Sequence, residues 1–160
     1  QKKDLRTYGH ANEKLFREEL PRITMMYGLP GITESVPEPD QYLSGGESFS
    51  IGSETAKVLF VPGHAPGHLA LFFDGIDYEL SGDLYLEKVT GSSPLFVAGD
   101  TLFRGSIGRT DLPGSVPEDL MKSLKTEILS LPDETKVLSG HGPDTEIGLE
   151  RGSNPFLKSL

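Results

Sequence analysis

Three short runs of apolar residues, each stopped by a glycine, dominate the hydrophobic pattern of this chain. The runs and the residues that follow them are Val58-Leu-Phe-Val-Pro-Gly-His64, Leu95-Phe-Val-Ala-Gly-Asp100 and Val137-Leu-Ser-Gly-His141. A continuous apolar run of this length, bounded by turn residues, is typical of a buried strand. Because glycine allows a tight turn, each strand is predicted to present its next residue at the mouth of a cleft.

The residues presented in this way are His64, Asp100 and His141. Imidazole nitrogens and carboxylate oxygens are ligands that zinc and iron accept. A single histidine after a strand is as easily a hydrogen-bonded turn residue as a metal ligand. Chance produces three repeats of the same pattern only rarely, so the pattern predicts that the three side chains share a metal site.

The N-terminal part of the chain has a helical pattern over residues 3–27. Pro21 lies inside it and predicts a kink or two helices, and Gly28 is expected to end it as a C-terminal cap. His10 is expected on the surface of this helix, without a role. The apolar positions share one helix face, and they are Leu15, Phe16, Leu20, Ile23 and Met26.

Short strands are predicted next, around 41–43, 48–52, 57–61 and 69–73, separated by turn residues. Asp74-Gly75 is a hairpin signal after the last of these strands. Alternating residues from Tyr78 to Val89 predict a second small hairpin around Ser81-Gly82-Asp83. Asp83 directly follows a glycine, as Asp100 does. A strand pair is predicted after Asp83, however, so we interpret it as a hairpin residue.

The C-terminal part alternates between helix and strand. Residues 117–131 are predicted as a helix that begins with proline and two acids, a strand follows at 136–139, and a short helix runs from Asp144 to about Gly152. This order indicates an α/β chain. The helix at 117–131 is expected to bury one face, formed by Leu120, Leu124, Ile128 and Leu131.

Composition limits the classes of function. The 160 residues are enough for one domain with a sizeable core, and we expect a single domain over 1–160. The formal charge is 15 − 24 = −9 without a basic cluster, which argues against nucleic-acid binding. The absence of cysteine excludes disulfides, thiolate metal sites and cysteine nucleophiles. No apolar run approaches the roughly 20 residues of a membrane span, so we expect a soluble, most simply cytoplasmic protein without a membrane partner.

These motifs together resemble the metallo-β-lactamase superfamily, specifically its glyoxalase II-like hydrolases. The resemblance covers nearly everything from residue 40 onward. It implies an αββα sandwich with a metal centre at one edge. The matching pieces, in order, are Pro62-Gly-His-Ala-Pro-Gly-His68, Ala98-Gly-Asp-Thr-Leu-Phe103, Arg104-Gly-Ser-Ile-Gly-Arg-Thr-Asp-Leu-Pro-Gly114, Gly140-His-Gly-Pro143 and Asn154-Pro-Phe-Leu157.

The resemblance also implies roles for single residues. His64 would bind a first metal ion, His141 a second, and Asp100 would bridge the two; zinc is expected, with iron as the other possibility. His68 would orient a ligand or meet the substrate. Arg104 would meet an anionic group of the substrate or be a solvated arginine. Arg109 and Asp111 are expected to form a structural ion pair, rather than to act in catalysis.

The activity implied by the resemblance is hydrolysis by a metal-bound hydroxide, in which Asp100 orients the nucleophile. A thioester such as a hydroxyacyl-glutathione is the expected small-molecule substrate, because a thiolate leaves without a strong general acid. A first alternative is an iron-dependent persulfide dioxygenase of the same superfamily, with one iron held by two histidines and an aspartate. A second alternative is that the chain is a non-catalytic fragment or an assembly partner.

One departure from the family's pattern is large. The first ligand cluster, His-x-His-x-Asp-His, does not occur in these 160 residues. We therefore expect an incomplete sandwich that lacks the first β-layer, and a site completed by a homo-oligomer or a complementing N-terminal chain. A milder departure is an insertion at about 76–93, expected on the surface.

Overall fold

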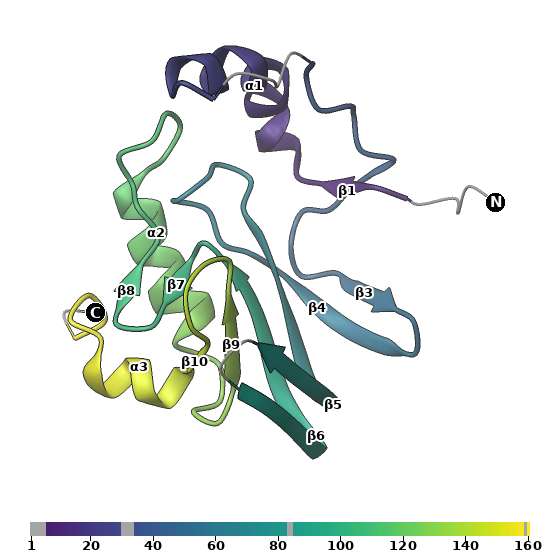
Figure 1. Ribbon diagram of the computed structural model, residues 1–160, viewed down its shortest axis with the longest axis vertical. Helices are drawn as coiled ribbons and strands as arrows, with labels where there is room; N and C mark the ends of the chain where they lie inside the picture. Colours follow the sequence, from purple (N-terminus) through teal and green to yellow (C-terminus); the bar gives the residue numbers. More distant parts are fainter. Residues whose placement is uncertain (1–5, 30–33, 83–84, 159) are drawn as a thin grey trace.

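The computed structural model describes residues 6–29, 34–82, 85–158 and 160, and one mixed sheet is its centre (Figure 1). In the described residues this sheet has six strands in the order β10-β9-β6-β5-β4-β3. β6 and β9 pair in parallel, and the other neighbours are antiparallel. The strands are β3 (Ser48–Ile51), β4 (Glu54–Phe60), β5 (Leu69–Gly82), β6 (Tyr85–Gly99), β9 (Lys136–Ser139) and β10 (Thr145–Glu146).

One face of the sheet packs against α2 (Pro117–Ser123) and the π-helical turn η2 (Leu124–Ile128) that continues it. This confirms the predicted helix and its buried face, because Leu120, Leu124 and Ile128 have no exposed surface. Burial of one leucine side chain stabilises a protein by about 1.5–3 kcal/mol, so this row contributes strongly to the core. The sheet residues on the same side are Leu59, Val61, Ala70, Phe96, Ala98 and Val137.

The predicted hairpin turn at Asp74-Gly75 is wrong. β5 continues through these residues and pairs with β6 as far as Gly82. The pairing register shifts between Phe73 and Ile76 and again between Ile76 and Tyr78. Apolar residues resume after Asp74-Gly75 and find partners on β6, so the dipeptide is absorbed in a bulge instead of reversing the chain.

The predicted insertion at 76–93 is therefore the outer part of one long β5–β6 hairpin rather than a separate unit. The second predicted hairpin, within 78–89, corresponds to the end of this hairpin, and Asp83 lies outside the described residues. A smaller apolar cluster lies along this pair of strands. It contains Ala56, Phe73 and Leu95, with Leu71, Ile76, Tyr78, Val97 and Leu138 partly buried against them.

The N-terminal helix starts later than predicted. β1 (Tyr8–Gly9) pairs with β2 (Gln41–Tyr42), then η1 (Ala11–Glu13) leads into α1 (Lys14–Met26). Pro21 lies inside one continuous helix and does not divide it. Proline has no N–H for the carbonyl of Arg17 four residues earlier, and the N–H of Val36 donates to that carbonyl at 3.3 Å instead.

The end of α1 and the place of His10 test two further expectations. Gly28 has φ of +67°, the left-handed conformation expected of a C-terminal cap. His10 is not on a helix surface: its Nδ1 accepts a hydrogen bond from the N–H of Asn12 at 3.1 Å, which caps η1. Its ring stacks on Phe60, with the ring centroids 4.3 Å apart. Residues 6–10 are extended because this cap starts the helix after them.

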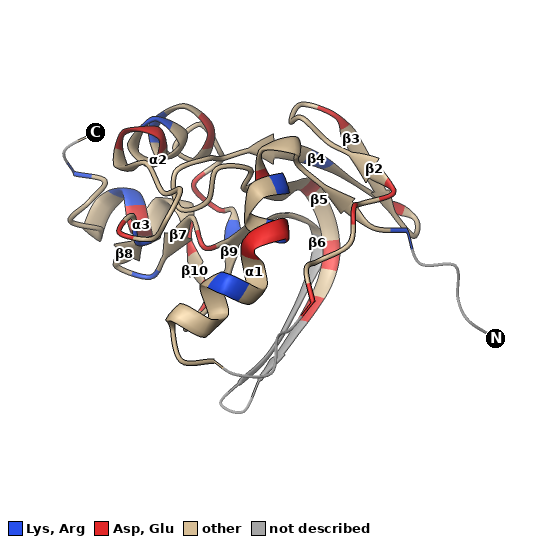
Figure 2. Ribbon diagram, turned by 90° about the horizontal axis from the view of Figure 1, so that it is seen from above, with Lys and Arg blue, Asp and Glu red and all other residues tan. Residues whose placement is uncertain are grey.

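α2 and α3 (Ile147–Ser153) lie along the sheet, whereas α1 stands apart from them (Figure 1). The apolar face of α1 is partly uncovered: Leu15 is 69% and Met26 67% exposed, whereas Phe16, Leu20 and Ile23 are half-buried. Acidic and basic residues are interspersed along α1, α2 and α3 (Figure 2). No helix in the described part of the chain is long and apolar enough to span a membrane.

The last predicted helix begins three residues late. Asp144 precedes β10, and its carboxylate lies 3.5 Å from the ammonium group of Lys136. β10 can form here because the residues after Asp144 pair with β9, Thr145 with Val137 and Glu146 with Lys136. The helix α3 then starts at Ile147.

Candidate metal centre

The ends of three strands meet, as their shared pattern predicts. The Nε2 atom of His141 lies 3.1 Å from Oδ2 of Asp100, and Nε2 of His64 lies 3.5 Å from the same oxygen. The parallel pairing of β6 and β9 brings Asp100 and His141 together, because the N–H of Gly140 donates to the carbonyl of Gly99 at 2.7 Å. The structure therefore brings together the three side chains that the sequence predicts as ligands.

Gly140 makes room for Asp100, and Gly99 makes room for His68 behind it. A Cβ atom on Gly140 would lie 2.2 Å from Oδ1 of Asp100, and a Cβ atom on Gly99 would lie 2.5 Å from Nε2 of His68. Gly99 also has φ of +53°, which disfavours side chains. These glycines therefore serve both the turn and the close packing around the carboxylate.

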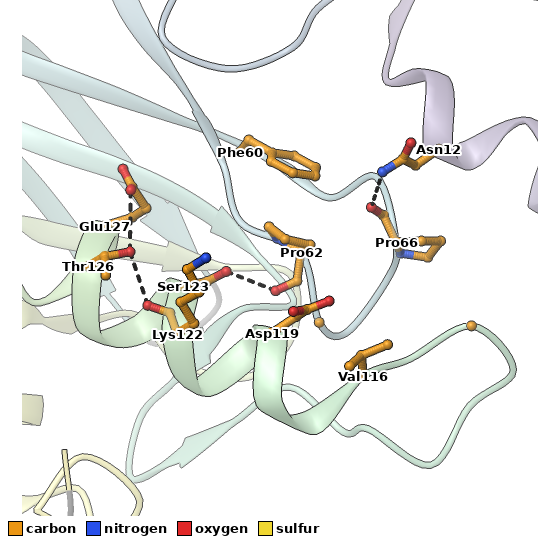
Figure 3. Close-up of a pocket in the computed structure, with 12 residues that line it drawn as sticks. Asn12, Phe60, Pro62, Pro66, Val116, Asp119, Lys122, Ser123, Thr126 and Glu127 are labelled. Atoms are coloured by element: carbon orange, nitrogen blue, oxygen red, sulfur yellow. Dashed lines mark hydrogen bonds between the residues drawn. The ribbon is translucent and has the colours of Figure 1, made fainter.

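The turn that carries His64 is clamped by the start of α2. Gly63 has φ of +133°, and a Cβ atom there would lie 2.2 Å from the backbone nitrogen of Leu120. The hydroxyl of Ser123 donates to the carbonyl of Pro62 at 2.9 Å, and that of Ser115 to the carbonyl of His64 at 2.7 Å. Figure 3 shows the Ser123 contact in a pocket of about 450 Å³ that none of the candidate ligands lines.

The backbone decides which nitrogen of His64 faces Asp100. Nδ1 of His64 lies 3.0 Å from the carbonyl oxygen of Arg109. Because a carbonyl only accepts hydrogen bonds, Nδ1 carries the proton. The neutral ring then has its lone pair on Nε2, the atom that faces Asp100, and a histidine that binds a metal is held in this way.

The distances around Asp100 suit metal ligation in pairs. Two ligand atoms at about 2.0–2.2 Å from a tetrahedral zinc lie about 3.3–3.6 Å apart, close to the 3.1 and 3.5 Å separations found here. Among the residues that the structure describes, however, no group of three or more His, Asp or Glu side chains is arranged to hold a metal ion. Each histidine thus forms a pair with Asp100 at a spacing that a bound metal ion accepts.

His141 lies at the open side of the site, with 76% of its side chain exposed. Its ring is parallel to that of Phe103, with the ring centroids 6.0 Å apart and 7° between the planes. Phe103 belongs to a small hairpin of β7 (Leu102–Phe103) and β8 (Ser106–Ile107). This hairpin, with Pro143, forms an apolar wall of a cavity of about 460 Å³ into which the three candidate ligands open.

His68 lies behind the site. Its Nδ1 is 3.5 Å from the hydroxyl of Thr101, and its ring centroid is 6.0 Å from that of His64. Burial and the neighbouring His64 lower the pKa of His68 to about 4, so the ring is neutral near pH 7. His68 does not line the cavity, and its expected role toward a ligand or the substrate stays a prediction.

Arg104 lines the cavity, but its guanidinium group donates two hydrogen bonds to the carbonyl of Asp144, at 2.6 and 3.0 Å. Arg109 and Asp111 form the expected ion pair through two hydrogen bonds of 2.7 Å. Arg109 lowers the pKa of Asp111 to about 2. The role of Arg104 toward an anionic substrate group stays a prediction.

The sequence analysis missed two residues beside the site, Phe103 and Glu150. Phe103 stacks on His141, and Glu150 on α3 accepts a hydrogen bond from the N–H of Gly105 in the β7–β8 turn. The signal for Phe103 was its place in the Thr-Leu-Phe that follows Asp100. A single acid in a short helix carries no comparable signal for Glu150.

Comparison with known proteins agrees with this geometry. No family model matches the chain. The chain is 35% identical over 160 residues to the probable metallo-hydrolase YqgX of Bacillus subtilis, covering 100% of this chain and 67% of that protein. It is 36% identical over 151 residues to the hydroxyacylglutathione hydrolase GloC of Haemophilus influenzae, covering 94% and 63%.

Solved structures give the same result. The chain matches the B3 metallo-β-lactamase BLEG-1 with a TM-score of 0.73 and 34% identity, over 96% of this chain and 65% of that one. It matches TTHA1623 in a di-iron-bound form with a TM-score of 0.69 and 36% identity, over 96% and 66%. The chain thus spans about two thirds of the length of these relatives. A metallo-hydrolase relative of 35% identity, covered to 67% of its length, and matching solved structures show that the chain belongs to the metallo-β-lactamase superfamily of metallo-hydrolases.

Proposed function

We propose that this chain contributes His64, Asp100 and His141 to a two-metal hydrolase site, with Asp100 as the link between the ions. The observation that carries the proposal is the approach of two imidazole Nε2 atoms to one carboxylate oxygen, at 3.5 and 3.1 Å. The second support is the proton on Nδ1 of His64, which leaves its Nε2 free to bind a metal. The proposed ions are zinc, with iron as the other candidate.

Each ion takes two ligands from the described part of the chain in this arrangement. Zinc in proteins takes four, so water, substrate or side chains outside this set would supply the others. When bound, the two ions would lower the pKa of a water molecule toward about 7 and stabilise a developing oxyanion. The free energy needed to order loosely held ligands reduces metal affinity. The ring of His64 is already held by the carbonyl of Arg109, so less free energy is needed to order it.

The proposed substrate is a thioester such as a hydroxyacyl-glutathione. The cavity, of about 460 Å³, is large enough for a small acyl group, and Phe103, Ile107 and Pro143 give it an apolar wall. A thiolate leaves without a strong general acid, and His68, held neutral by its pKa of about 4, is a poor proton donor near pH 7. The likeness to a hydroxyacylglutathione hydrolase, at 36% identity, supports this substrate class.

The test is the metal content of the purified 160-residue chain after dialysis, measured by elemental mass spectrometry, together with hydrolysis of a hydroxyacyl-glutathione. We expect bound zinc or iron in the wild-type chain and a loss of metal in Asp100→Asn. Asp133→Asn is the matched control, because Asp133 lies in an exposed ion pair with Arg151 and does not line the cavity. A chain without metal would contradict the proposal and favour the non-catalytic alternative.

A second candidate keeps the ligands and changes the chemistry to an iron-dependent persulfide dioxygenase. The likeness to TTHA1623 in a di-iron-bound form, at a TM-score of 0.69, supports iron as the metal, and the two histidines and one aspartate at the site match the ligand types of a single-iron centre. Oxygen consumption with a glutathione persulfide separates the two candidates. Oxygen uptake by the iron-loaded chain without thioester hydrolysis would support the dioxygenase. Thioester hydrolysis without oxygen uptake would exclude it.

A further inference from the structure

Glu150 is a buried carboxylate outside the proposed ligand set. Its side chain is 1% exposed, on the inner side of α3. Oε1 accepts a hydrogen bond from the hydroxyl of Thr145 at 2.6 Å, and Oε2 accepts from the N–H of Gly105 and from Nδ2 of Asn154, both at 2.8 Å. Burial of a carboxylate is costly unless its oxygens are satisfied, and here three neutral donors satisfy them.

Asn154, one turn later, extends this arrangement. It has no exposed surface, and its Nδ2 also donates to the carbonyl of Ser106 at 3.0 Å. Its Oδ1 accepts from the N–H of Phe156 at 3.0 Å, which fixes the orientation of the amide. Glu150 and Asn154 therefore hold the N–H of Gly105 and the carbonyl of Ser106, two consecutive residues where the β7–β8 turn enters β8.

The hairpin held in this way, together with the residues that directly follow β8, contacts both candidate histidine ligands. At the end of β7, the ring of Phe103 stacks on His141. Just beyond β8, the carbonyl of Arg109 accepts the proton of Nδ1 of His64. The hydroxyl of Ser139, next to the His141 turn, donates to the carbonyl of Leu102 at 2.7 Å. Displacement of the turn would move groups that orient both imidazole rings.

We propose that Glu150 and Asn154 are positioning residues, which act through the β7–β8 hairpin to set the ring orientation of His64 and His141. The proposal rests on the proposed function for its purpose, but its physical content is the position of the hairpin and can be tested without metal. The competing explanation is that the pair only packs α3 onto the domain.

The decisive measurement is the tautomer of His64, read from ¹⁵N chemical shifts in the metal-free chain above the usual imidazole pKa. Wild type is expected to carry the proton on Nδ1. Glu150→Ala is expected to mix the two tautomers, because the Arg109 carbonyl is no longer held in place. The affinity for Co²⁺, measured by optical titration, is expected to fall about tenfold or more, as for other residues that orient ligands.

Two matched variants separate positioning from packing. In Glu150→Gln the amide oxygen can still accept from Gly105 and Asn154, and its NH₂ group can donate to Thr145, so the wild-type tautomer is expected. Arg151→Ala, on the same helix, removes hydrogen bonds to Asp133 and to the carbonyls of Leu129 and Leu131, none of which touches the hairpin. It is expected to lower Tm without a change of tautomer.

If Glu150→Ala does not fold, Asn154→Ala decides by the same readout, since it leaves Glu150 its Thr145 and Gly105 donors. An unchanged His64 tautomer in Glu150→Ala and Asn154→Ala would overturn the proposal. An equal change of tautomer in Arg151→Ala would also overturn it. If Glu150→Ala shifts the tautomer but the wild-type chain binds no Co²⁺, the positioning role is supported and the proposed function is contradicted. If the wild-type chain binds Co²⁺ but Glu150→Ala keeps the wild-type tautomer, the proposed function is supported and the positioning role is contradicted.

Discussion

At the scale of single residues, Gly140 shows how tightly the backbone surrounds Asp100. The glycine precedes His141, and its hydrogen bond to Gly99 joins the ends of β9 and β6. A Cβ atom there would lie 2.2 Å from Oδ1 of Asp100. A methyl group at this position therefore competes directly with the carboxylate for space.

We predict that Gly140→Ala weakens metal binding at least tenfold, because Asp100 must rotate away from His64 and His141. Titration with Co²⁺ measures this effect. Gly152→Ala is the control, since Gly152 lies in α3 with nothing within 4 Å of the added methyl group. Equal metal affinity in Gly140→Ala and wild type would contradict the assignment of Asp100 as a ligand.

His68 predicts a dependence of stability on pH. Burial holds the pKa of His68 at about 4, below its usual value of 6.5. Below pH 6.5 the unfolded chain therefore takes up a proton that the folded chain does not. The contribution of neutral His68 is fully present above pH 6.5 and is lost as the pH falls toward 4.

The measurement is urea unfolding at pH 7 and pH 5, with the pKa of His68 followed by NMR. The free energy of unfolding is expected to fall by an amount on the order of 1 kcal/mol over this interval. His68→Gln should show a smaller fall than wild type. A His68 pKa near 6.5 in the folded chain would contradict the burial argument.

At the scale of elements, the sequence predicted those whose hydrophobic period is regular. The helix at 117–131 and the strand at 136–139 are where the pattern places them. The errors lie where a local signal competes with tertiary pairing: Asp74-Gly75 has the composition of a hairpin turn, but β6 offers partners to residues on both sides of it. The composition of a dipeptide indicates that it can form a hairpin turn. Whether the turn forms depends on the pairing that the neighbouring strand offers.

The core row of α2 and η2 predicts a large loss of stability on truncation. Leu124 is fully buried between the helix and the sheet. Leu124→Ala should lower the free energy of unfolding by about 2–5 kcal/mol, because it leaves a cavity in a closely packed core. Leu149→Ala, at a residue 52% exposed, is the control and should change little when both are unfolded in urea. Similar losses in both would contradict the assigned core.

At the scale of the whole molecule, one sheet carries the core on the side of α2, while α1 leaves part of its apolar face exposed. The chain spans 67% of the B. subtilis relative and 63% of the H. influenzae relative. Two ligands per proposed ion are fewer than the four that zinc takes.

The sequence by itself determined the buried strands, the helix that packs on them and the three residues that follow the strands, because these depend on hydrophobic period and on glycine at turns. Only the tertiary structure decided how these residues meet. The carbonyl of Arg109 selects the tautomer of His64, Phe103 stacks on His141, and buried Glu150 holds the turn between them. Such contacts join residues far apart in the chain, and no local pattern encodes them because their geometry exists only once the sheet and α3 have packed together.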